Sequence, residues 1–288
     1  MSIDGIVLVT GATGQQGGAV ARQLQAAGAG AKVRAMTRHP EGEKARELAA
    51  LGLEIVRGDL DDRDSLARAV RGAWGVHGVQ NTWEAGVERE EAQGKRLVEV
   101  ARENNVYHYV YSSVGSAHRR TGIPHFDNKW RVEESLRAAA FPSWTVLRPV
   151  FFMENLLGPF FKPSIDQGTL RVALDPKTKL QMIAVADIGK YGRLAFEEHQ
   201  RLNGREIDIA GDAKTMPEVA EILSRVTGRR IGFERLPIEV ARSASQEYAI
   251  MLEWFDAVGY DADIEGNARE FGIRPTPFEE WARTVRWD

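Results

Sequence analysis

The chain has 288 residues, of which 43% are hydrophobic and 27% are charged, and its formal net charge is -3 at pH 7. This composition is typical of a globular protein and excludes extensive disorder. The slightly acidic balance predicts no general attraction to nucleic acid or to anionic membranes. At roughly 150 residues per domain, the length predicts one large domain or two modest ones.

The sequence lacks cysteine and also lacks the patterns that are typical of metal sites, signal peptides and membrane spans. It has no cysteine, which excludes disulfides, thiolate metal sites and cysteine nucleophiles and fits a reducing compartment. Its six histidines show no metal-ligand spacing, so we expect no metal. The opening Met-Ser-Ile-Asp-Gly lacks the features of a signal peptide, and no apolar run approaches a membrane span. We therefore expect a cytoplasmic protein.

The first 150 residues alternate strand-like and helix-like segments. Residues 5–10 form a short apolar run, as expected for a strand that is buried on both faces. Such alternation predicts right-handed crossovers and a Rossmann-type, doubly wound parallel sheet, the α/β class. We expect further strands at 32–37, 53–57, 73–80, 106–112 and 144–147, and helices at 16–27, 41–51, 63–70 (begun by Asp61 and Asp62), 88–104 and 125–138.

The pattern changes after Pro149. Short strands and helices follow without a flexible linker, which predicts a smaller α+β part. We expect the domains to be residues 1–150 for the cofactor and 151–288 for a substrate or partner, tightly packed and partly interleaved. The expected strands are 168–174, 180–185, 206–210 and 231–236, and the helices are 187–198 (with Asp187 as N-cap), 216–226 and most of 237–287.

Three glycines directly follow the first strand and open the first helix. Gly11 allows a sharp turn, Gly14 allows a diphosphate to approach the backbone, and Gly17 allows the helix to pack close to the strand. The amide groups and the dipole of the helix N-terminus would hold the anion. The alternative is a glycine-rich turn without a ligand. We predict a dinucleotide site that also includes Thr13, Gln15 and Gln16.

The end of the second predicted strand indicates which cofactor is bound. An NAD-preferring fold places an acidic residue there, about 20 residues after the glycines. This chain has Thr37 and Arg38 instead. A guanidinium can pair with a 2′-phosphate, and Thr37 can add a hydroxyl. The alternative is that Arg38 is merely solvated; we predict NADP(H) in preference to NAD(H).

The glycine string Gly-Ala-Thr-Gly-Gln-Gln-Gly-Gly, the helix sequence His-Phe-Asp-Asn-Lys and the segment that begins at Arg148-Pro149 together resemble the NmrA-like family. This family belongs to the atypical short-chain dehydrogenase/reductases, and the match is to its HSCARG-like members. The resemblance implies a Rossmann fold with NADP(H). It also implies that Asp59 and Leu60 lie against adenine, although Asp61 and Asp62 also suit a helix cap.

The resemblance further implies contacts near the nicotinamide. Gln80 and Asn81 follow the fourth predicted strand, and Phe152 and Asn155 lie in the aromatic segment after Pro149. Aromatic clusters of this kind also arise from simple packing. Ala92, Glu41 and Gly42 replace basic residues of the HSCARG-like pattern, which predicts weaker phosphate contacts.

The catalytic motif is altered. Short-chain dehydrogenases place a serine at the end of the fifth strand, where this chain has Ser112 and Ser113, and follow it with Tyr-x-x-x-Lys on the next helix. This chain has His125 at the tyrosine position and Lys129 at the lysine position. Either His125 acts as the acid, or Lys129 alone handles the proton, or Lys129 only binds the cofactor. A histidine without a role is a further alternative.

These alternatives lead to different functions. If Lys129 only binds the cofactor, the resemblance implies an NADP(H)-sensing regulator that acts through a protein partner. The other possibility is an NADPH-dependent reductase of a small electrophilic carbonyl or quinone that uses Lys129 or His125. A sugar-nucleotide epimerase needs the missing tyrosine. We expect no direct nucleic-acid or membrane partner, and self-association is left open.

Overall fold

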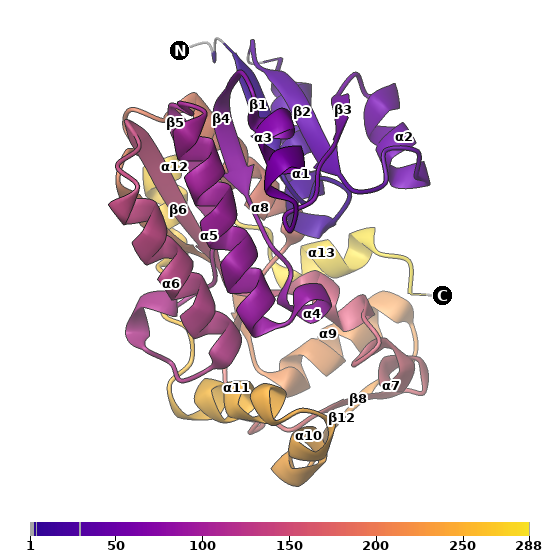
Figure 1. Ribbon diagram of the computed structural model, residues 1–288. Coiled ribbons are helices and arrows are strands. Elements are labelled where there is room, and N and C mark those ends of the chain that lie inside the picture. Colours follow the sequence, from indigo (N-terminus) through magenta and orange to yellow (C-terminus); the bar gives the residue numbers. More distant parts are fainter. Residues whose placement is uncertain (1–2, 4, 29, 288) are drawn as a thin grey trace. The chain divides into compact units, whose positions relative to one another are not determined.

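The computed structural model describes residues 3, 5–28 and 30–287, and its chain divides into two compact units (Figure 1). Unit 1 consists of Met1–Ala117, His125–Arg148 and Ile188–Ile207. Unit 2 consists of His118–Pro124, Pro149–Asp187 and Asp208–Asp288. Each unit is therefore assembled from separate stretches of the sequence.

A seven-stranded sheet forms the centre of unit 1, with the order β10-β6-β5-β4-β1-β2-β3. The pairings from β3 through β1 to β6 are all parallel. The chain moves outward from β1 on one side and from β4 on the other, which confirms the doubly wound Rossmann-type fold and places the topological switch point between β1 and β4. The strands are β1 Ile6–Val9, β2 Lys32–Thr37, β3 Glu54–Arg57, β4 Ala73–Gly78, β5 His108–Ser112, β6 Ser143–Pro149 and β10 Arg205–Ile209.

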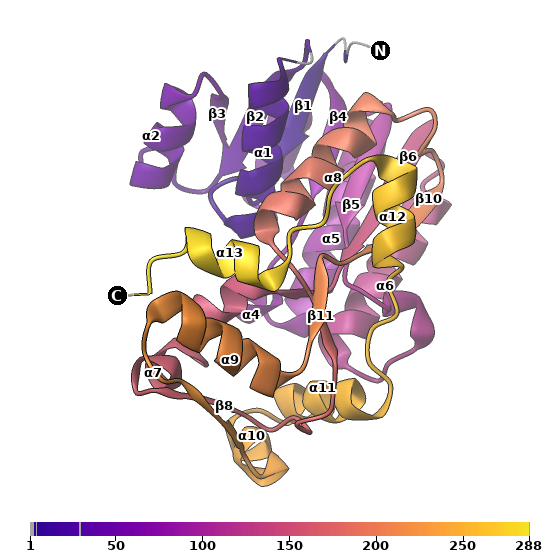
Figure 2. The same cartoon turned by 180° about the vertical axis from the view of Figure 1, so that it is seen from behind.

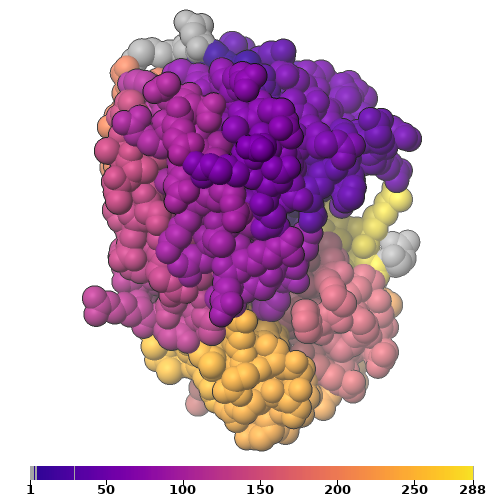
Figure 3. All heavy atoms as spheres, viewed as in Figure 1, coloured from indigo at the N-terminus to yellow at the C-terminus, as the bar shows by residue number. Residues whose placement is uncertain are grey.

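Helices cover both faces of this sheet. On one face lie α3 (Arg63–Val70), α5 (Val87–Glu103) and α6 (Pro124–Ala138), whose outer side chains form a continuous surface in Figure 3. On the other face lie α1 (Gln15–Ala27), α2 (Glu43–Ala50) and α8 (Val185–Glu197), as Figure 2 shows. A Cβ added to Gly192 of α8 would approach the Val20 side chain of α1 to 2.5 Å, so glycine permits this close packing.

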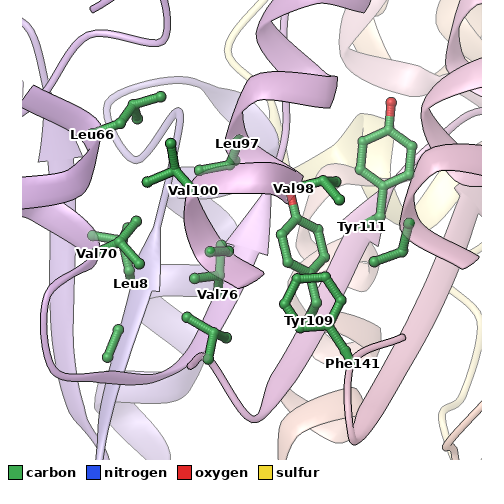
Figure 4. Close-up of a cluster of buried hydrophobic side chains, with 14 of the residues drawn as sticks. Leu8, Leu66, Val70, Val76, Leu97, Val98, Val100, Tyr109, Tyr111 and Phe141 are labelled. Carbon is green, nitrogen blue, oxygen red and sulfur yellow. The ribbon is translucent and has the colours of Figure 1, made fainter. Parts of the chain in front are cut away.

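The core between the sheet and the α3–α5–α6 layer is apolar (Figure 4). Leu8 and Val76 of the sheet and Leu97 of α5 are completely buried, and the rings of Tyr109 and Phe141 lie 5.2 Å apart between centroids. Burial of these apolar side chains is the main contribution to the stability of the sheet against helices α3, α5 and α6.

Two local predictions are wrong, and one short helix was not predicted. This one-turn helix, α4, spans Thr82–Ala85. Asp61 does not cap α3; its carboxylate instead accepts hydrogen bonds from Arg89 and Gln93 of α5. Asp187 is not an N-cap, because α8 begins two residues earlier, and its carboxylate accepts hydrogen bonds from Thr276.

The α3 cap allows a direct test. Asp62 accepts hydrogen bonds from the backbone amides of Asp64 and Ser65. We expect Asp62→Ala to lower the free energy of unfolding by about 1 kcal/mol, the usual cost of losing an N-cap. Urea unfolding of the two proteins measures the difference, with Asp64→Ala as the control; equal stability of the Asp62 variant and the parent would contradict the capping role.

Unit 2 mixes short strands and helices, as predicted. β7 (Phe151–Phe152) pairs in parallel with β9 (Leu180–Ile183), which pairs antiparallel with β11 (Asp212–Lys214); β8 (Thr169–Val172) pairs in parallel with β12 (Gly232–Arg235). Thr215 and Glu218 form a capping box at the start of α9. The helices are α7 Lys162–Asp166, α9 Met216–Thr227, α10 Ile238–Ala244, α11 Gln246–Ala257, α12 Ile264–Phe271 and α13 Phe278–Thr284, with 3-10 turns at Ala117–Arg119 and Met153–Leu157.

Candidate functional site

The loop after β1 is fixed to the end of β4 by a buried threonine. The hydroxyl of Thr10 accepts a hydrogen bond from the Val79 amide at 2.9 Å and lies 3.1 Å from the Val79 carbonyl oxygen, to which it donates. These contacts join the two strands that flank the switch point. The loop that follows Thr10 therefore starts from a rigid base.

The glycines of this loop meet strict steric requirements. Gly11 has a φ of +57°, and a Cβ there would approach the Val79 side chain to 2.9 Å. A Cβ on Gly17 would overlap the carbonyl oxygen of Thr10, so α1 packs closely against the end of β1, as predicted. The Gly14 amide donates to the Gly11 carbonyl oxygen at 2.8 Å, which closes the turn.

The N-terminus of α1 has features suited to an anion. Gly14 is the N-cap, no side chain caps the helix, and its first turn carries no acidic residue. The amides of the first turn have no partner within a helix, and the helix dipole is positive there. Gly11 and Gly14 are exposed, so an anion can reach these amides. Gln16 is held from the side, because its Oε1 accepts a hydrogen bond of 2.6 Å from Ser112.

Arg38 follows β2, as predicted, but it is not simply solvated. Its guanidinium forms an ion pair with the Glu84 carboxylate of α4. Arg57, at the end of β3, donates a hydrogen bond of 3.2 Å to the Arg38 carbonyl oxygen. The Thr37 hydroxyl accepts from the His39 amide at 3.1 Å. The Arg57 guanidinium thus reaches the backbone of the residue that follows β2, a contact that the sequence pattern did not predict.

Asp59 and Leu60 form a fixed turn after β3. The Asp59 carboxylate accepts from the Asp61 amide at 3.0 Å, and the Asp59 amide donates to Ser65 Oγ at 2.9 Å. Leu60 packs against the apolar core of unit 1. One Asp59 oxygen therefore has a structural role, and the proposed contact of this turn with adenine stays a prediction.

Two polar side chains at the strand ends have hydrogen-bonding capacity to spare. Gln80 is buried beyond β4, and neither atom of its amide finds a partner among the residues that the structure describes. The hydroxyl of buried Ser113, which follows β5, is likewise unpartnered in the described part of the chain. Because buried polar groups normally have hydrogen-bond partners, these two groups are suited to bind the polar atoms of a ligand. Asn81 has a structural contact, since its Oδ1 caps α4 at the Trp83 amide.

The charged centre of the site is Glu90 of α5, a residue that was not predicted to belong to it. Its side chain is 1% exposed and accepts hydrogen bonds from the Thr82 hydroxyl and, at 2.8 Å, from the Asn128 amide nitrogen. The Lys129 ammonium lies 2.7 Å from Glu90 Oε1. A signal was present in the sequence: Glu90 shares the helical stripe of buried Gly94 and Leu97, where a carboxylate is out of place.

The environment of Glu90 favours its ionised form. Burial raises the pKa of Glu90, but the Lys129 charge and the hydrogen bonds from Lys129, Thr82 and Asn128 lower it, and the net direction is downward. Glu90 is therefore a carboxylate near neutral pH, and Lys129 is held beside a permanent negative charge.

His125 lies one helical turn before Lys129, at the start of α6. It is buried, and its ring centroid lies 5.4 Å from that of Trp83 and 4.9 Å from that of Phe126. Trp83 itself is largely exposed. Helix α4 thus brings Trp83 to His125 and Thr82 to Glu90, next to Lys129.

Phe152 and Asn155 belong to unit 2, in β7 and the 3-10 turn that follows it. Their predicted contact with the nicotinamide stays a prediction. Within unit 2, the rings of Phe151 and Phe161 pack edge to face with 6.0 Å between centroids, and Phe161 is buried, so part of the aromatic cluster forms core packing.

Arg148, the first residue of the family-like segment, has a structural role in unit 1. It is buried, and its Nε and Nη2 donate to the two carboxylate oxygens of Glu133 at 2.9 and 2.6 Å. Its Nη2 also pairs with Glu206 of β10. This charged cluster joins α6 to the edge of the sheet.

These residues fit a dinucleotide. An uncapped helix N-terminus and exposed glycines lie at the switch point between β1 and β4. Arg38 and Arg57 lie at the ends of β2 and β3, and unpartnered Gln80 and Ser113 follow β4 and β5. The described residues contain no group of histidine, aspartate and glutamate side chains that would hold a metal ion.

A family model described as the NmrA-like family matches residues 4–282. The chain belongs to the NmrA-like family. It is 30% identical over 288 residues to (4-alkanoyl-5-oxo-2,5-dihydrofuran-3-yl)methyl phosphate reductase from Streptomyces griseus, and the match covers 96% of each chain.

Several solved structures share its fold. The negative transcriptional regulator NmrA, in complex with NADP, matches with a TM-score of 0.81 at 22% identity, over 99% of this chain and 96% of that one. The same regulator has also been solved with NAD. An NADPH-dependent quinone oxidoreductase from Escherichia coli, complexed with NADPH, matches with a TM-score of 0.82 at 22% identity, over 97% and 99% of the two chains.

None of the helices in the described ranges has the length and apolar character that crossing a membrane requires.

Proposed function

We propose that unit 1 binds NADP(H). The uncapped N-terminus of α1 behind exposed Gly11 and Gly14 carries this proposal. The amides of Gln15, Gln16 and Gly17 would hold the diphosphate, and Gly14, which has no side chain, would leave room for it. Arg38 and Arg57, at the ends of β2 and β3, would attract a 2′-phosphate. The NADP and NADPH complexes of the structural relatives support the same assignment.

We further propose that the protein is a sensor or regulator that responds to the cofactor and acts through a protein partner. Bound nicotinamide supplies or accepts a hydride, and most enzymes of this type aim a tyrosine at the reacting oxygen. Here His125 takes that position and contacts Trp83, while the Lys129 ammonium is held by the buried carboxylate of Glu90. Lys129 then serves to bind cofactor, and no hydroxyl at the motif position donates a proton.

A second candidate is an NADPH-dependent reductase. The 30% identical reductase, whose named substrate is an alkanoyl-substituted dihydrofuranone, favours it. Hydride addition to such an electrophile, or to a quinone, leaves an anion on oxygen that must take one proton. In this chain Lys129 or His125 would provide that proton, and solvent would replace it.

Calorimetry with ligand-free protein tests the binding proposal. We expect NADPH to bind more tightly than NADH. We expect Arg38→Ala to weaken NADPH binding about tenfold, close to 1.4 kcal/mol, because a charge-assisted contact with the 2′-phosphate is lost. NADH affinity is expected to stay within about twofold. No heat with either cofactor would refute the proposal.

A turnover assay separates the two functions. The purified protein is mixed with NADPH and a panel of quinones, enones and aldehydes, and absorbance at the NADPH band is followed. A sensor is expected to show no oxidation above that of free NADPH. Sustained oxidation that the Arg38→Ala variant loses at limiting NADPH would assign the reductase function instead.

A further inference from the structure

Helix α4 connects two parts of the proposed NADP(H) site. At its start, Thr82 donates a hydrogen bond to Glu90, which holds Lys129. Two residues later, Glu84 pairs with Arg38. The helix is closed at its N-terminus by the Asn81 side chain and at its C-terminus by a hydrogen bond of 2.7 Å from the Gly86 amide to the Thr82 carbonyl oxygen. Its short backbone is therefore well defined, and it places the Glu84 carboxylate on the guanidinium.

The Glu84 carboxylate uses the donors that a 2′-phosphate would need. A guanidinium presents its donors in one plane and binds carboxylate and phosphate in the same manner. A phosphate cannot take this face while a carboxylate of the same sign holds it. The 2′-hydroxyl of NAD(H) carries no charge, so it has no need of Arg38 and leaves the ion pair intact.

The ion pair is weak enough to be exchanged. The side chains of Arg38 and Glu84 are 47% and 53% exposed, and such pairs contribute little stability because water screens them. A phosphate with up to two negative charges competes well for the same guanidinium. NADP(H) must nevertheless break the Arg38–Glu84 ion pair to bind, and this free-energy cost lowers its affinity. NAD(H) does not break the pair, so its affinity is unchanged.

We propose that Glu84 is a specificity-determining residue, an internal competitor for Arg38 that lowers the preference for NADP(H) over NAD(H). This inference rests on the proposed function, since it requires that NADP(H) binds at Arg38. It also assigns a purpose to α4, a helix that the sequence did not predict.

The test is calorimetric titration of NADPH and NADH into the 288-residue protein and four variants, Glu84→Gln, Glu88→Gln, Arg38→Ala and the double variant Arg38→Ala/Glu84→Gln. We expect Glu84→Gln to bind NADPH about fivefold more tightly, with NADH affinity within about twofold. Glu88→Gln is the matched control, because it removes the same charge from a nearby exposed residue of α5. In an Arg38→Ala background, Glu84→Gln is expected to change NADPH affinity by less than about twofold.

Several results would overturn the inference. Unchanged NADPH affinity in Glu84→Gln would overturn it. An equal increase of NADPH affinity in Glu88→Gln would also overturn it, because the effect would then come from the net charge of the protein and not from Glu84. A gain that persists without Arg38 would also do so. If the parent protein binds NADPH and only the Glu84 effect is missing, the proposed function stands and the competitor role falls; if the parent binds neither cofactor, both fall.

A second measurement reports on α4 itself. Exposed Trp83 lies directly before Glu84, so displacement of the carboxylate should alter the surroundings of the indole. We expect NADPH to change the Trp83 fluorescence, taken as the difference between the parent and Trp83→Phe, by more than NADH does at saturation. Equal changes with the two cofactors would contradict displacement of Glu84.

Discussion

Glu90→Ala is expected to lower the free energy of unfolding by about 3–5 kcal/mol, the usual result of removing one partner from a buried ion pair. The substitution leaves the buried Lys129 ammonium beside a cavity, and it also removes the acceptor of Thr82 and Asn128. Urea unfolding at pH 7 measures the change. Glu88→Ala is the control, because Glu88 lies on the exposed side of the same helix.

The double variant Glu90→Leu/Lys129→Met separates charge from packing. Replacing both members of a buried pair by apolar residues of similar volume costs much less than breaking the pair. We expect the double variant to recover at least half of the stability lost in Glu90→Ala. A double variant that is as unstable as the single one would show that the ion pair is not the cause.

Stability is expected to fall as the pH is lowered from about 6.5 to about 4, because two histidines of the sheet are buried in neutral form. Burial lowers the pKa of His77 to about 4, and both of its ring nitrogens lack a partner among the described residues. Burial, together with the neighbouring His199, lowers the pKa of His108 to about 3. The unfolded chain binds a proton on each near pH 6.5, whereas the folded chain does not.

The sign of the effect follows from these directions. The stabilisation from a depressed histidine pKa is complete above the unfolded value and is lost as the pH falls toward the folded value. For His77 alone the loss is on the order of 3 kcal/mol. We expect His77→Leu to flatten the dependence of unfolding free energy on pH between 6.5 and 4, measured in urea at several pH values. Exposed His39→Gln should leave the slope unchanged, and an unchanged slope in His77→Leu would refute the assignment.

The glycine loop was the part of the site that could be predicted best. Gly11 lies in the loop after β1, and Gly17 lies in the first turn of α1. Gly11 has a positive φ, and Gly17 approaches the Thr10 carbonyl oxygen closely, so both need glycine for reasons that arise near them along the chain. The alternation of apolar strands and helices likewise depends on local periodicity. The strands and helices of unit 1, apart from α4, were therefore predicted to within two residues at each end.

The partners of the charged residues could not be predicted. Asp61 was expected to cap the next helix, as its neighbour Asp62 does, but it pairs with Arg89 of α5 instead. Either aspartate suits a cap by sequence, and the contact of Asp61 with α5 exists only in the folded structure. Asp187 has a partner 89 positions further along the chain, for the same reason.

The local sequence was sufficient for the fold class, the glycine turn after β1 and the absence of an acid at the end of β2, because each of these features depends on residues that lie close together along the chain. The tertiary structure alone decided that Arg38 meets Glu84 and that Lys129 meets Glu90. These contacts join residues that lie 46 and 39 positions apart, and a carboxylate has no preference among the cations of a sequence until packing brings one within reach.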